Sequence, residues 1–359
     1  MHLDGKLDTD GPTHVVAYSV TGISGYLGVT LWTSLSTKGT ATVRSSKVAL
    51  HTAAFKVYGA AVEVVGVDDL VKGSFTDILK DVNAVIHQAA PLPGRSASLA
   101  EALDISVQGS LNLLVQAEKA GIKNFSYAGS AITYTNDFAL DRGPLDEDDW
   151  LPITREGVLS IKEPDAGLIY AAEKVLAERA VWEFADQHPH VELTSVGPTY
   201  FFGPFAPGHK APFEGETFNK DFFKSSMAFL WRLLQPKNPV PPPDHFVDVR
   251  DVARALVAGI QAPPASQVGR KRILLSSPRP QPSELIALIT KHRPELVPRL
   301  NEAYKARPDG VTQFIENKRA KEILKLEIIP WEKTILDAVD ALVQLEDTWK
   351  GRGKPIVFE

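Results

Sequence analysis

The glycine-rich segment Thr21–Gly28 constrains the fold of this chain more than any other stretch of its 359 residues. It follows an apolar run that predicts a β-strand at residues 14–20, and a helical pattern comes after it. Gly22 permits a tight turn, Gly25 lets a pyrophosphate approach the backbone, and Gly28 lets the helix pack closely on the sheet. The free N–H groups at the start of that helix favour the same anion. The segment therefore predicts a phosphate-binding turn between a strand and a helix; the alternative is a glycine-rich turn without a ligand.

The first two-thirds of the chain alternates short apolar runs with amphipathic helical stretches. This alternation is typical of βαβ units, in which helices join parallel strands. Helices are predicted at residues 99–120 and 168–187, because apolar residues recur there at helical spacing and Gly121 and Pro189 follow. We therefore predict the α/β class, with a doubly wound parallel sheet of the Rossmann type and a smaller, mostly helical C-terminal substrate lobe. The predicted strands are residues 14–20, 40–43, 62–65, 84–86, 125–128, 193–196 and 273–276.

Tyr170 and Lys174 lie four residues apart on a predicted helix, so both side chains project from one face. An ammonium group beside a phenol favours phenolate and lowers the phenol pKa. Such a phenol can give or take a proton near neutral pH. Many Tyr-x-x-x-Lys pairs are simply solvated helix faces, so the pair indicates catalysis only together with the glycine-rich turn.

The residues after the second predicted strand indicate which dinucleotide binds. Sites that prefer NAD place an acidic residue about 20 residues after the glycine-rich turn, where it contacts the ribose. Here Arg44 occupies that place, Ser45, Ser46 and Lys47 follow, and no acid is adjacent in sequence. A guanidinium suits the 2′-phosphate of NADP(H), which we therefore expect in preference to NAD(H). The alternative is an arginine that only faces solvent.

Composition changes along the chain and suggests a division into domains. Residues 204–243 are rich in Phe, Pro and Lys, and the chain from residue 281 onward has a mostly helical pattern. The acidic run at residues 146–149 is interpreted as a solvated loop. We predict a flexible leader at residues 1–13, an NADP-binding domain at residues 14–203 to which residues 244–277 return, and a substrate-binding lobe made of residues 204–243 and 278–359.

Charge and composition exclude several classes of function. The 44 acidic and 39 basic residues give a net charge of -5, which argues against a nucleic-acid partner. The chain has no cysteine, which excludes disulfides and thiolate catalysis, and its nine histidines show no metal-binding spacing. No apolar run is long enough to span a membrane, and residues 1–13 lack the apolar core of a secretory signal. We expect a cytoplasmic protein without metal or membrane partner, as a monomer or a homodimer.

With these parts assembled, the chain resembles the extended short-chain dehydrogenase/reductase family. Within that family it is similar to the dihydroflavonol reductase-like branch, which includes fungal NADPH-dependent aldehyde and ketone reductases. The resemblance covers roughly residues 15–257 well and the remainder weakly. The segments that carry it are Thr21–Gly28, Thr42–Arg44, Asp69–Leu70 with Gly73–Phe75, His87–Pro91, Pro198–Pro204 and His245–Ala253.

The resemblance implies a third catalytic residue after the fifth strand. In the run Phe125–Ala131 this place falls to Ser130, and Thr133 is the substitute if the register differs. The implied cofactor contacts are Gly22, Ser24, Gly25, Tyr26, Leu27, Gly28, Arg44, Lys47, Asp69, Leu70, Ala89, Ala90, Pro91, Tyr170, Lys174, Pro198, Thr199 and Phe201. The predicted substrate pocket contains Leu92, Ile132, Thr133, Tyr134 and Tyr200.

The chain departs from the family pattern at three positions. Gly129 replaces a common serine, which we expect to matter little. Ser106 replaces an asparagine that helps a proton relay in many relatives, so that relay is in doubt. Glu173 replaces the usual serine or alanine, and it can pair with Lys174 or face solvent.

The resemblance implies that Ser130, Tyr170 and Lys174 act together on a carbonyl group. Ser130 would hydrogen-bond the carbonyl oxygen, Tyr170 would deliver a proton to it, and Lys174 would hold the nicotinamide ribose. We therefore expect an NADPH-dependent oxidoreductase that transfers hydride to a small apolar or aromatic aldehyde or ketone, or oxidises the alcohol in reverse. Three alternatives stay open: a hydroxysteroid dehydrogenase, a nucleotide-sugar epimerase of the same family, and a non-catalytic NADP(H)-binding redox sensor.

Overall fold

A central parallel sheet organises the protein. The computed structural model describes residues 18–35, 38–89, 98–135, 145–209, 226–310, 315–353 and 356. The sheet has seven strands in the order β3-β2-β1-β4-β5-β6-β9, and every neighbouring pair is parallel. All seven predicted strands are confirmed, although residues 14–17 of the first lie outside the described residues. The strands are β1 Tyr18–Thr21, β2 Gly39–Val43, β3 Val62–Gly66, β4 Ala84–His87, β5 Asn124–Ala128, β6 Glu192–Pro198 and β9 Lys271–Leu275.

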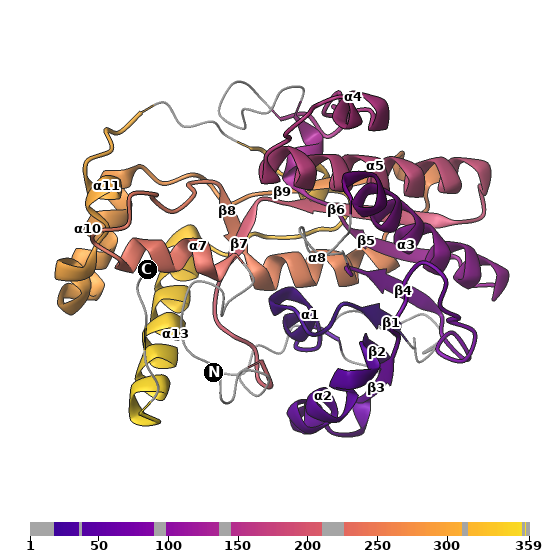
Figure 1. The fold of residues 1–359 in the computed structure, drawn as a ribbon, viewed down its shortest axis with the longest axis horizontal. Coiled ribbons are helices and arrows are strands. Elements are labelled where there is room, and N and C mark those ends of the chain that lie inside the picture. Colours follow the sequence, from indigo (N-terminus) through magenta and orange to yellow (C-terminus); the bar gives the residue numbers. More distant parts are fainter. Residues whose placement is uncertain are drawn as a thin grey trace.

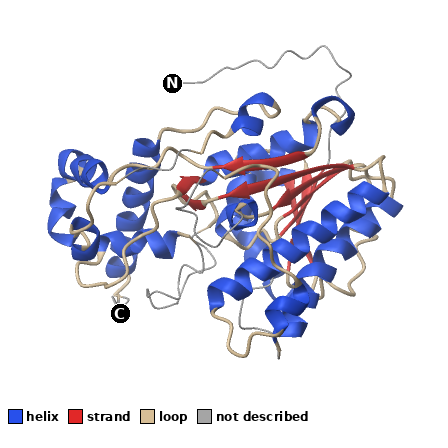
Figure 2. Ribbon diagram, turned by 90° about the horizontal axis from the view of Figure 1, so that it is seen from above, coloured by secondary structure: helices blue, strands red, loops and turns tan. Residues whose placement is uncertain are grey.

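Helices cover both faces of this sheet, as Figure 2 shows from above. On one face α3 (Leu99–Lys119) packs against α5 (Ala166–Gln187), and on the other α1 (Tyr26–Leu31) packs against α8 (Val249–Gln261). Both long predicted helices are thus confirmed. Among the described residues, the other helices are α2 Val48–Ala54, α4 Arg155–Leu159, α7 Met227–Trp231, α9 Ala265–Val268, α10 Pro282–His292, α11 Glu302–Lys305, α12 Lys318–Glu322 and α13 Trp331–Gly351, with 3₁₀ helices η1 Ser45–Lys47, η2 Phe55–Ala61, η3 Ala131–Tyr134, η5 Arg232–Leu234 and η6 Pro294–Arg299.

Local chemistry explains where the two long helices begin. Ser98 caps α3, because its side chain accepts a hydrogen bond from the Glu101 N–H group. Asp165 caps α5 in the same way, accepting from Leu168 N at 2.8 Å. These caps satisfy N–H groups that have no partner within a helix. They fix the start of α5 one turn before Tyr170.

A second, two-stranded parallel sheet was missed by the sequence reading. It pairs β7 (Tyr200–Phe202) with β8 (Phe246–Asp248), and β8 runs directly into α8. Asp248 caps α8 through Arg250 N and also accepts a hydrogen bond from Thr334 of α13 at 2.9 Å. The segment around residue 248 therefore joins the C-terminal helices to the sheet. Strands of three residues are too short to produce a recognisable alternation.

The C-terminal helices gather beside one end of the sheet, where Figure 1 shows α7, α10, α11 and α13. Glu346 of α13 is completely buried and accepts hydrogen bonds from Trp231 at 2.7 Å and from Arg299 at 2.8 Å. One continuous cluster of buried apolar side chains extends from Val20 of β1 to Trp349 of α13. The predicted lobe thus shares its core with the sheet. The leader at residues 1–13 lies outside the described residues, and so do residues 210–225.

The acidic run at residues 146–149 is only partly the solvated loop that the sequence suggested, because Asp146 and Asp148 are exposed but Glu147 is not. Glu147 is largely buried, and its carboxylate accepts hydrogen bonds from the N–H groups of Leu274 and Arg319. Burial raises the pKa of this carboxyl group. Asp148 forms an ion pair with Arg319 at 2.7 Å. The run therefore fastens its loop to β9 and α12, which lie more than 120 residues away in sequence.

Candidate active site

The carboxyl ends of parallel strands meet at one edge of the sheet, and most predicted site residues lie there. The chain leaves β1 for β2 on one side and later enters β4 on the other, so the strand order reverses between β1 and β4. In α/β sheets of this kind, ligands bind outside the carboxyl ends at the point of reversal. Thr21, the last residue of β1, pairs with His87, the last residue of β4. The glycine-rich turn follows Thr21 directly.

The glycine-rich turn has the shape of a phosphate cradle. Gly22 has φ 75°, and a Cβ there would lie 2.9 Å from Ala89 Cα, so both the backbone angle and the space require glycine. A Cβ on Gly28 would overlap Ile23 and lie 2.7 Å from Gly22 O. By contrast, a Cβ on Gly25 would meet no atom closer than 3.5 Å. Gly25 thus leaves the backbone open at the start of α1, which fits a pyrophosphate group.

The side chains next to this cradle hold the turn in place. Tyr26 is buried, and its hydroxyl group donates to Gly203 O at 2.7 Å. Leu27 is buried in the core. The ring of Phe201, a further predicted cofactor contact, stacks on Tyr26 at 6.0 Å. Tyr26 and Leu27 can therefore offer a cofactor their backbone but not their side chains, whereas Ser24 beside them is exposed.

Arg44 stands exposed at the end of β2, and the exposed residues Ser45 and Lys47 follow it in η1. The structure also places an acid here, which the sequence reading missed. Asp68 accepts a hydrogen bond from Ser45 N at 2.8 Å, and hydrogen bonds from Ser45 lower its pKa, with a smaller contribution from Arg44. The pairing of Val43 with Gly66 aligns the ends of β2 and β3 and so brings Asp68 beside Ser45, a register that is not visible in the sequence.

The segment after β3 forms a fastened turn. Asp69 Oδ1 accepts hydrogen bonds from Val71 N at 2.8 Å and from Lys72 N at 3.0 Å. Asn112 of α3 donates to Leu70 O at 3.0 Å. Asp69 and Leu70, the predicted adenine contacts, are therefore held beside α3.

A buried histidine supports the strand ends beneath the cradle. Thr21 Oγ1 lies 2.7 Å from His87 Nδ1, and it accepts from Ala89 N at 3.3 Å. Burial lowers the pKa of His87 to about 3, and Lys174 contributes. His87 is therefore neutral near pH 7, and one hydrogen bond joins its Nδ1 to Thr21 Oγ1. Ala90, Pro91 and Leu92 lie outside the described residues.

Ser130, Tyr170 and Lys174 converge at the end of β5. Ser130 follows β5 at the start of η3, and Tyr170 and Lys174 project from α5. Tyr170 Oη donates to Ser130 Oγ at 3.2 Å, and Lys174 Nζ donates to Ala128 O at 3.4 Å. Ser130 is 8% exposed and Tyr170 is 39% exposed, so a substrate can reach the pair of hydroxyl groups.

The phenol of Tyr170 is not acidified as the sequence reading expected. Desolvation raises its pKa, the hydrogen bond to Ser130 lowers it, and the charge of Glu173 raises it again. Lys174 is not among the groups that shift this pKa. Glu173 itself is only 5% exposed, and burial raises its pKa to about 7 against a smaller, opposite contribution from Lys174. Glu173 therefore does not face solvent and forms no ion pair with Lys174, and its charge opposes ionisation of the phenol.

The predicted substrate pocket is corrected at two positions. Tyr200 is 37% exposed and Ile132 is half-buried, so both can contact a ligand. Thr133 and Tyr134 are completely buried. Tyr134 Oη donates to Ile273 O at 3.2 Å beneath the sheet edge. Because neither side chain reaches a surface that a substrate could touch, the prediction is wrong for Thr133 and Tyr134.

An aromatic pair and a cation stand beside Tyr170. The ring of Phe229 meets Tyr200 edge-on at 5.1 Å, and the Arg232 guanidinium lies 4.6 Å above the Phe229 ring. Tyr170 and Arg232 both influence the pKa of Tyr200, which desolvation raises. Arg232 forms no ion pair with any residue that the structure describes. The sequence analysis identified residues 204–243 as rich in Phe, Pro and Lys but did not single out Arg232.

At the end of β6, Thr199 N donates to Leu275 O at 3.0 Å, which extends the pairing of β6 with β9. Pro198 ends β6, so Pro198 and Thr199 lie at the same edge of the sheet as Ser130. Nowhere in the described parts of the chain do three His, Asp or Glu side chains gather to hold a metal ion. Similarly, no described helix combines the length and apolar character needed to cross a bilayer.

Comparison with known proteins gives consistent matches. A family model described as the NAD dependent epimerase/dehydratase family matches residues 18–273. A Candida albicans protein provisionally named an NADPH-dependent methylglyoxal reductase is 31% identical over 355 residues, which cover 90% of this chain and 97% of that protein. Aldehyde reductase 2 of Sporidiobolus salmonicolor is 26% identical over 271 residues, 71% of this chain and 74% of its own.

Solved structures share the same fold. The yeast methylglyoxal/isovaleraldehyde reductase, solved in complex with NADPH, matches with a TM-score of 0.73 at 21% identity, covering 92% of this chain and 99% of that one. Vestitone reductase from alfalfa matches with a TM-score of 0.69 at 20% identity, covering 91% and 98%. At these identities the likeness shows the fold alone.

Proposed function

Because the chain belongs to the NAD dependent epimerase/dehydratase family, we propose that it is an NADP-dependent oxidoreductase acting on carbonyl and alcohol groups. Its substrate is a small apolar or aromatic aldehyde or ketone. The observation that carries the proposal is the 3.2 Å hydrogen bond between Tyr170 and Ser130, beside a glycine turn open to a phosphate. The names of the relatives, an NADPH-dependent methylglyoxal reductase and an aldehyde reductase, support the same class of reaction.

The residues that the structure describes fit NADP(H). Gly25 leaves its backbone open to the pyrophosphate, and exposed Arg44 at the end of β2 can bind the 2′-phosphate. The exposed Arg44 guanidinium, with Ser45 and Lys47 after it, favours NADP(H) over NAD(H). Bound NADPH supplies the hydride for the carbonyl carbon.

The chain's own residues handle the carbonyl oxygen. Tyr170 and Ser130 are close enough for both hydroxyl groups to hydrogen-bond one oxygen atom. As negative charge develops on that oxygen, the Tyr170 phenol delivers its proton and Ser130 stabilises the charge. The raised pKa of Tyr170 keeps the phenol protonated at neutral pH, which suits a proton donor in the reduction direction. Lys174 lies one turn away and adds a positive charge near the same edge.

The side chains around Tyr170 favour a compact apolar or aromatic substrate. The rings of Tyr200 and Phe229 lie next to each other beside Tyr170, and Ile132 lies after Ser130. Aromatic side chains recognise such molecules by large contact area and by ring-edge geometry. Arg232 adds one cation at this surface, so a substrate with an acidic group remains within the proposed class.

The test is the loss of NADPH absorbance in the near-ultraviolet with a panel of small aldehydes and ketones, repeated with NADH. We expect turnover with NADPH and weaker turnover with NADH. Tyr170→Phe removes the proton donor and keeps the ring, so turnover should fall by at least about 100-fold while NADPH binding persists. Wild-type turnover in that variant would refute the assignment. Binding of NADPH without turnover of any compound would instead support the redox sensor.

A further inference from the structure

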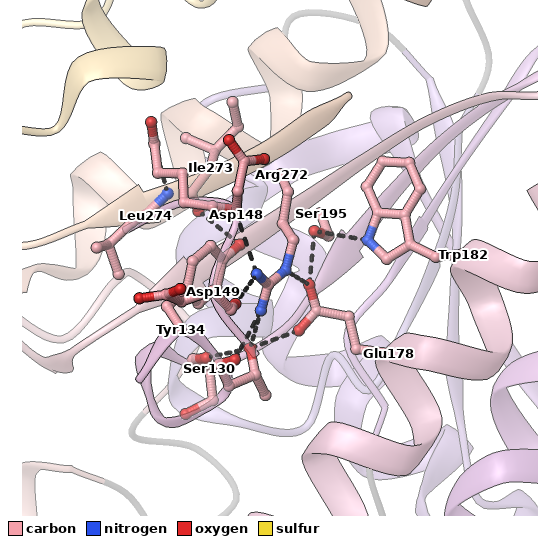
Figure 3. Close-up of polar contacts among 12 residues, drawn as sticks. Ser130, Tyr134, Asp148, Asp149, Glu178, Trp182, Ser195, Arg272, Ile273 and Leu274 are labelled. Atoms are coloured by element: carbon pink, nitrogen blue, oxygen red, sulfur yellow. Dashed lines mark hydrogen bonds and ion pairs between the residues drawn. The ribbon is translucent and has the colours of Figure 1, made fainter. Parts of the chain in front are cut away.

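A completely buried ion pair joins Arg272 to Glu178, which lies one helical turn beyond Lys174 on α5. Figure 3 shows the polar contacts around this pair. Arg272 Nε of β9 donates to Glu178 Oε1 of α5 at 3.1 Å, and neither side chain is exposed. Desolvation makes such a pair costly unless the remaining donors and acceptors are also satisfied. Neither residue was singled out from the sequence, and neither reaches a surface where a substrate could bind.

The Arg272 guanidinium ties three separate segments together. Its donors reach the carbonyl oxygens of Glu147 and Asp149 in the acidic loop and Thr133 O at 2.8 Å in η3. Its plane lies between two rings, 3.8 Å from the centre of Tyr134 and 3.6 Å from the centre of Trp150. A planar guanidinium held on both faces and at its edges has no freedom to turn.

The Glu178 carboxylate connects the Arg272 guanidinium to the turn that carries Ser130. Its Oε2 accepts a hydrogen bond from Thr133 Oγ1 at 2.6 Å, and its Oε1 accepts from Ser195 Oγ at 2.8 Å. Thr133 Oγ1 also lies 2.9 Å from Ser130 O. A hydroxyl group has one hydrogen, and the shorter contact to a charged acceptor takes it. Ser130 O is still satisfied, because Thr133 N donates to it at 3.0 Å.

The backbone packs tightly beside the Glu178 carboxylate and the Tyr134 ring. A Cβ on Gly129 would lie 3.2 Å from Glu178 Oε2, which is tighter than ordinary contact. A Cβ on Gly197 would overlap the ring of Tyr134. Gly129, which the sequence reading expected to matter little, therefore provides the room in which Glu178 meets the Ser130 turn.

We propose that Glu178 and Arg272 are positioning residues, which act through Thr133 to set the distance between Ser130 Oγ and Tyr170 Oη. Glu178 lies on the same helix as Tyr170, and Thr133 holds the turn that carries Ser130. The buried pair therefore joins the two elements whose hydroxyl groups must share one oxygen atom. This inference rests on the reductase function proposed above.

The variant Thr133→Val tests the link, since it keeps the volume and removes the hydroxyl group. Displacement of a reacting group by about 1 Å can cost about 100-fold in rate, so we expect kcat to fall about 10- to 100-fold. The KM for NADPH should stay within about twofold, because the cradle lies on other elements. Thr133→Ser, which retains the hydroxyl, should recover most of the lost kcat.

Ser195→Ala is the matched control. Ser195 donates to the same carboxylate, but it lies on β6, and it contacts η3 only at Tyr134 and not at Thr133, whose hydroxyl group the first variant removes. We expect similar loss of thermal stability in Ser195→Ala and Thr133→Val, with a large loss of kcat only in the second. Equal losses of kcat in both would overturn the proposal, because general loosening would then explain them.

A double-mutant comparison separates positioning from stability. In a Ser130→Ala background, Thr133→Val should lower the residual kcat by less than about twofold, since the group that it positions is already gone. The same loss in both backgrounds would mean that Thr133 does not act through Ser130.

A crystal structure of Thr133→Val decides the inference without any turnover. We expect the Ser130 Oγ to Tyr170 Oη distance to grow beyond the 3.2 Å of the wild type. An unchanged distance would overturn the positioning role. If the wild-type protein reduces no compound in the panel, the proposed function fails, and this measurement still shows whether the buried pair controls the separation of the two hydroxyl groups.

Discussion

Glu173 offers the sharpest test of the electrostatics at this site. Its carboxyl group is buried beside Tyr170 and makes no hydrogen bond with any described residue. Burial raises its pKa from 4.5 to about 7. Since one pKa unit corresponds to about 1.4 kcal/mol, the ionised form destabilises the folded protein by about 3 kcal/mol at most. Glu173→Gln keeps the shape of the side chain and removes this penalty.

The direction of the pH dependence follows from where the protons are bound. Below pH 4.5 the Glu173 carboxyl group is protonated in both the folded and the unfolded protein, so its ionisation does not lower the free energy of unfolding. Between pH 4.5 and about 7 the unfolded chain loses its proton first, and the stability contributed by this group falls as the pH rises. Above about pH 7 the full penalty applies. Glu173→Gln should therefore be more stable than the wild type at pH 8 and equally stable near pH 4.

The assay is urea unfolding of both proteins at pH 4.5, 6 and 8, followed by circular dichroism. We expect the difference in unfolding free energy to grow with pH to about 2–3 kcal/mol at pH 8. Glu183→Gln, an exposed position on the same helix, is the control and should change stability by less than about 0.5 kcal/mol. A pH-independent difference, or a less stable Glu173→Gln at pH 8, would refute the reasoning. The variant should also lower the pKa of Tyr170, because the neighbouring charge that raises it is gone.

Two further substitutions test the cradle and the substrate surface. Gly25→Ala should weaken NADPH binding at least about 10-fold, because the added methyl group would occupy the space left for the pyrophosphate. It should not lower thermal stability, because a Cβ at Gly25 would lie no closer than 3.5 Å to another atom of the protein. Gly28→Ala should weaken NADPH binding and also lower the free energy of unfolding by about 2 kcal/mol, because its Cβ overlaps backbone atoms. Tight NADPH binding by Gly25→Ala would contradict the role of the glycine-rich turn as a phosphate cradle. Arg232→Met should raise the KM of a carbonyl compound that carries a carboxylate about 10-fold and leave an uncharged aromatic aldehyde unchanged. An equal increase in KM for both compounds would show that Arg232 does not bind the carboxylate of the substrate.

The parallel sheet could be predicted because its strands are short, buried apolar runs with clear breaks. The glycine-rich turn added a constraint that depends only on local geometry, and Gly22 and Gly28 have the backbone and packing that require glycine. The short β7–β8 pair could not be predicted in this way. Its strands are only three residues long, and they are brought together by the packing of α8 and α13.

The candidate site shows the same division between local and distant effects. The Tyr170–Lys174 spacing and the serine after β5 are local features, and the structure brings their side chains together. Asp68 beside Ser45 depends on the register of two parallel strands, and the burial of Thr133 depends on Arg272, 139 residues away. Charge in a sequence does not show whether a side chain is solvated, which is why the burial of Glu147 within the acidic run was not predicted.

The four-residue spacing of Tyr170 and Lys174 on α5 extends to Glu178, which was not predicted from the sequence. Tyr170, Lys174 and Glu178 occupy successive turns of one helix and face the sheet from one side. The first is open to a ligand, the second bonds the end of β5, and the third is closed inside the protein. An acid at that third place has no solvent, so its charge requires a buried cation, and Arg272 of β9 supplies it. The helical periodicity that identifies Tyr170 and Lys174 therefore also identifies Glu178, the residue that we propose positions the turn carrying Ser130.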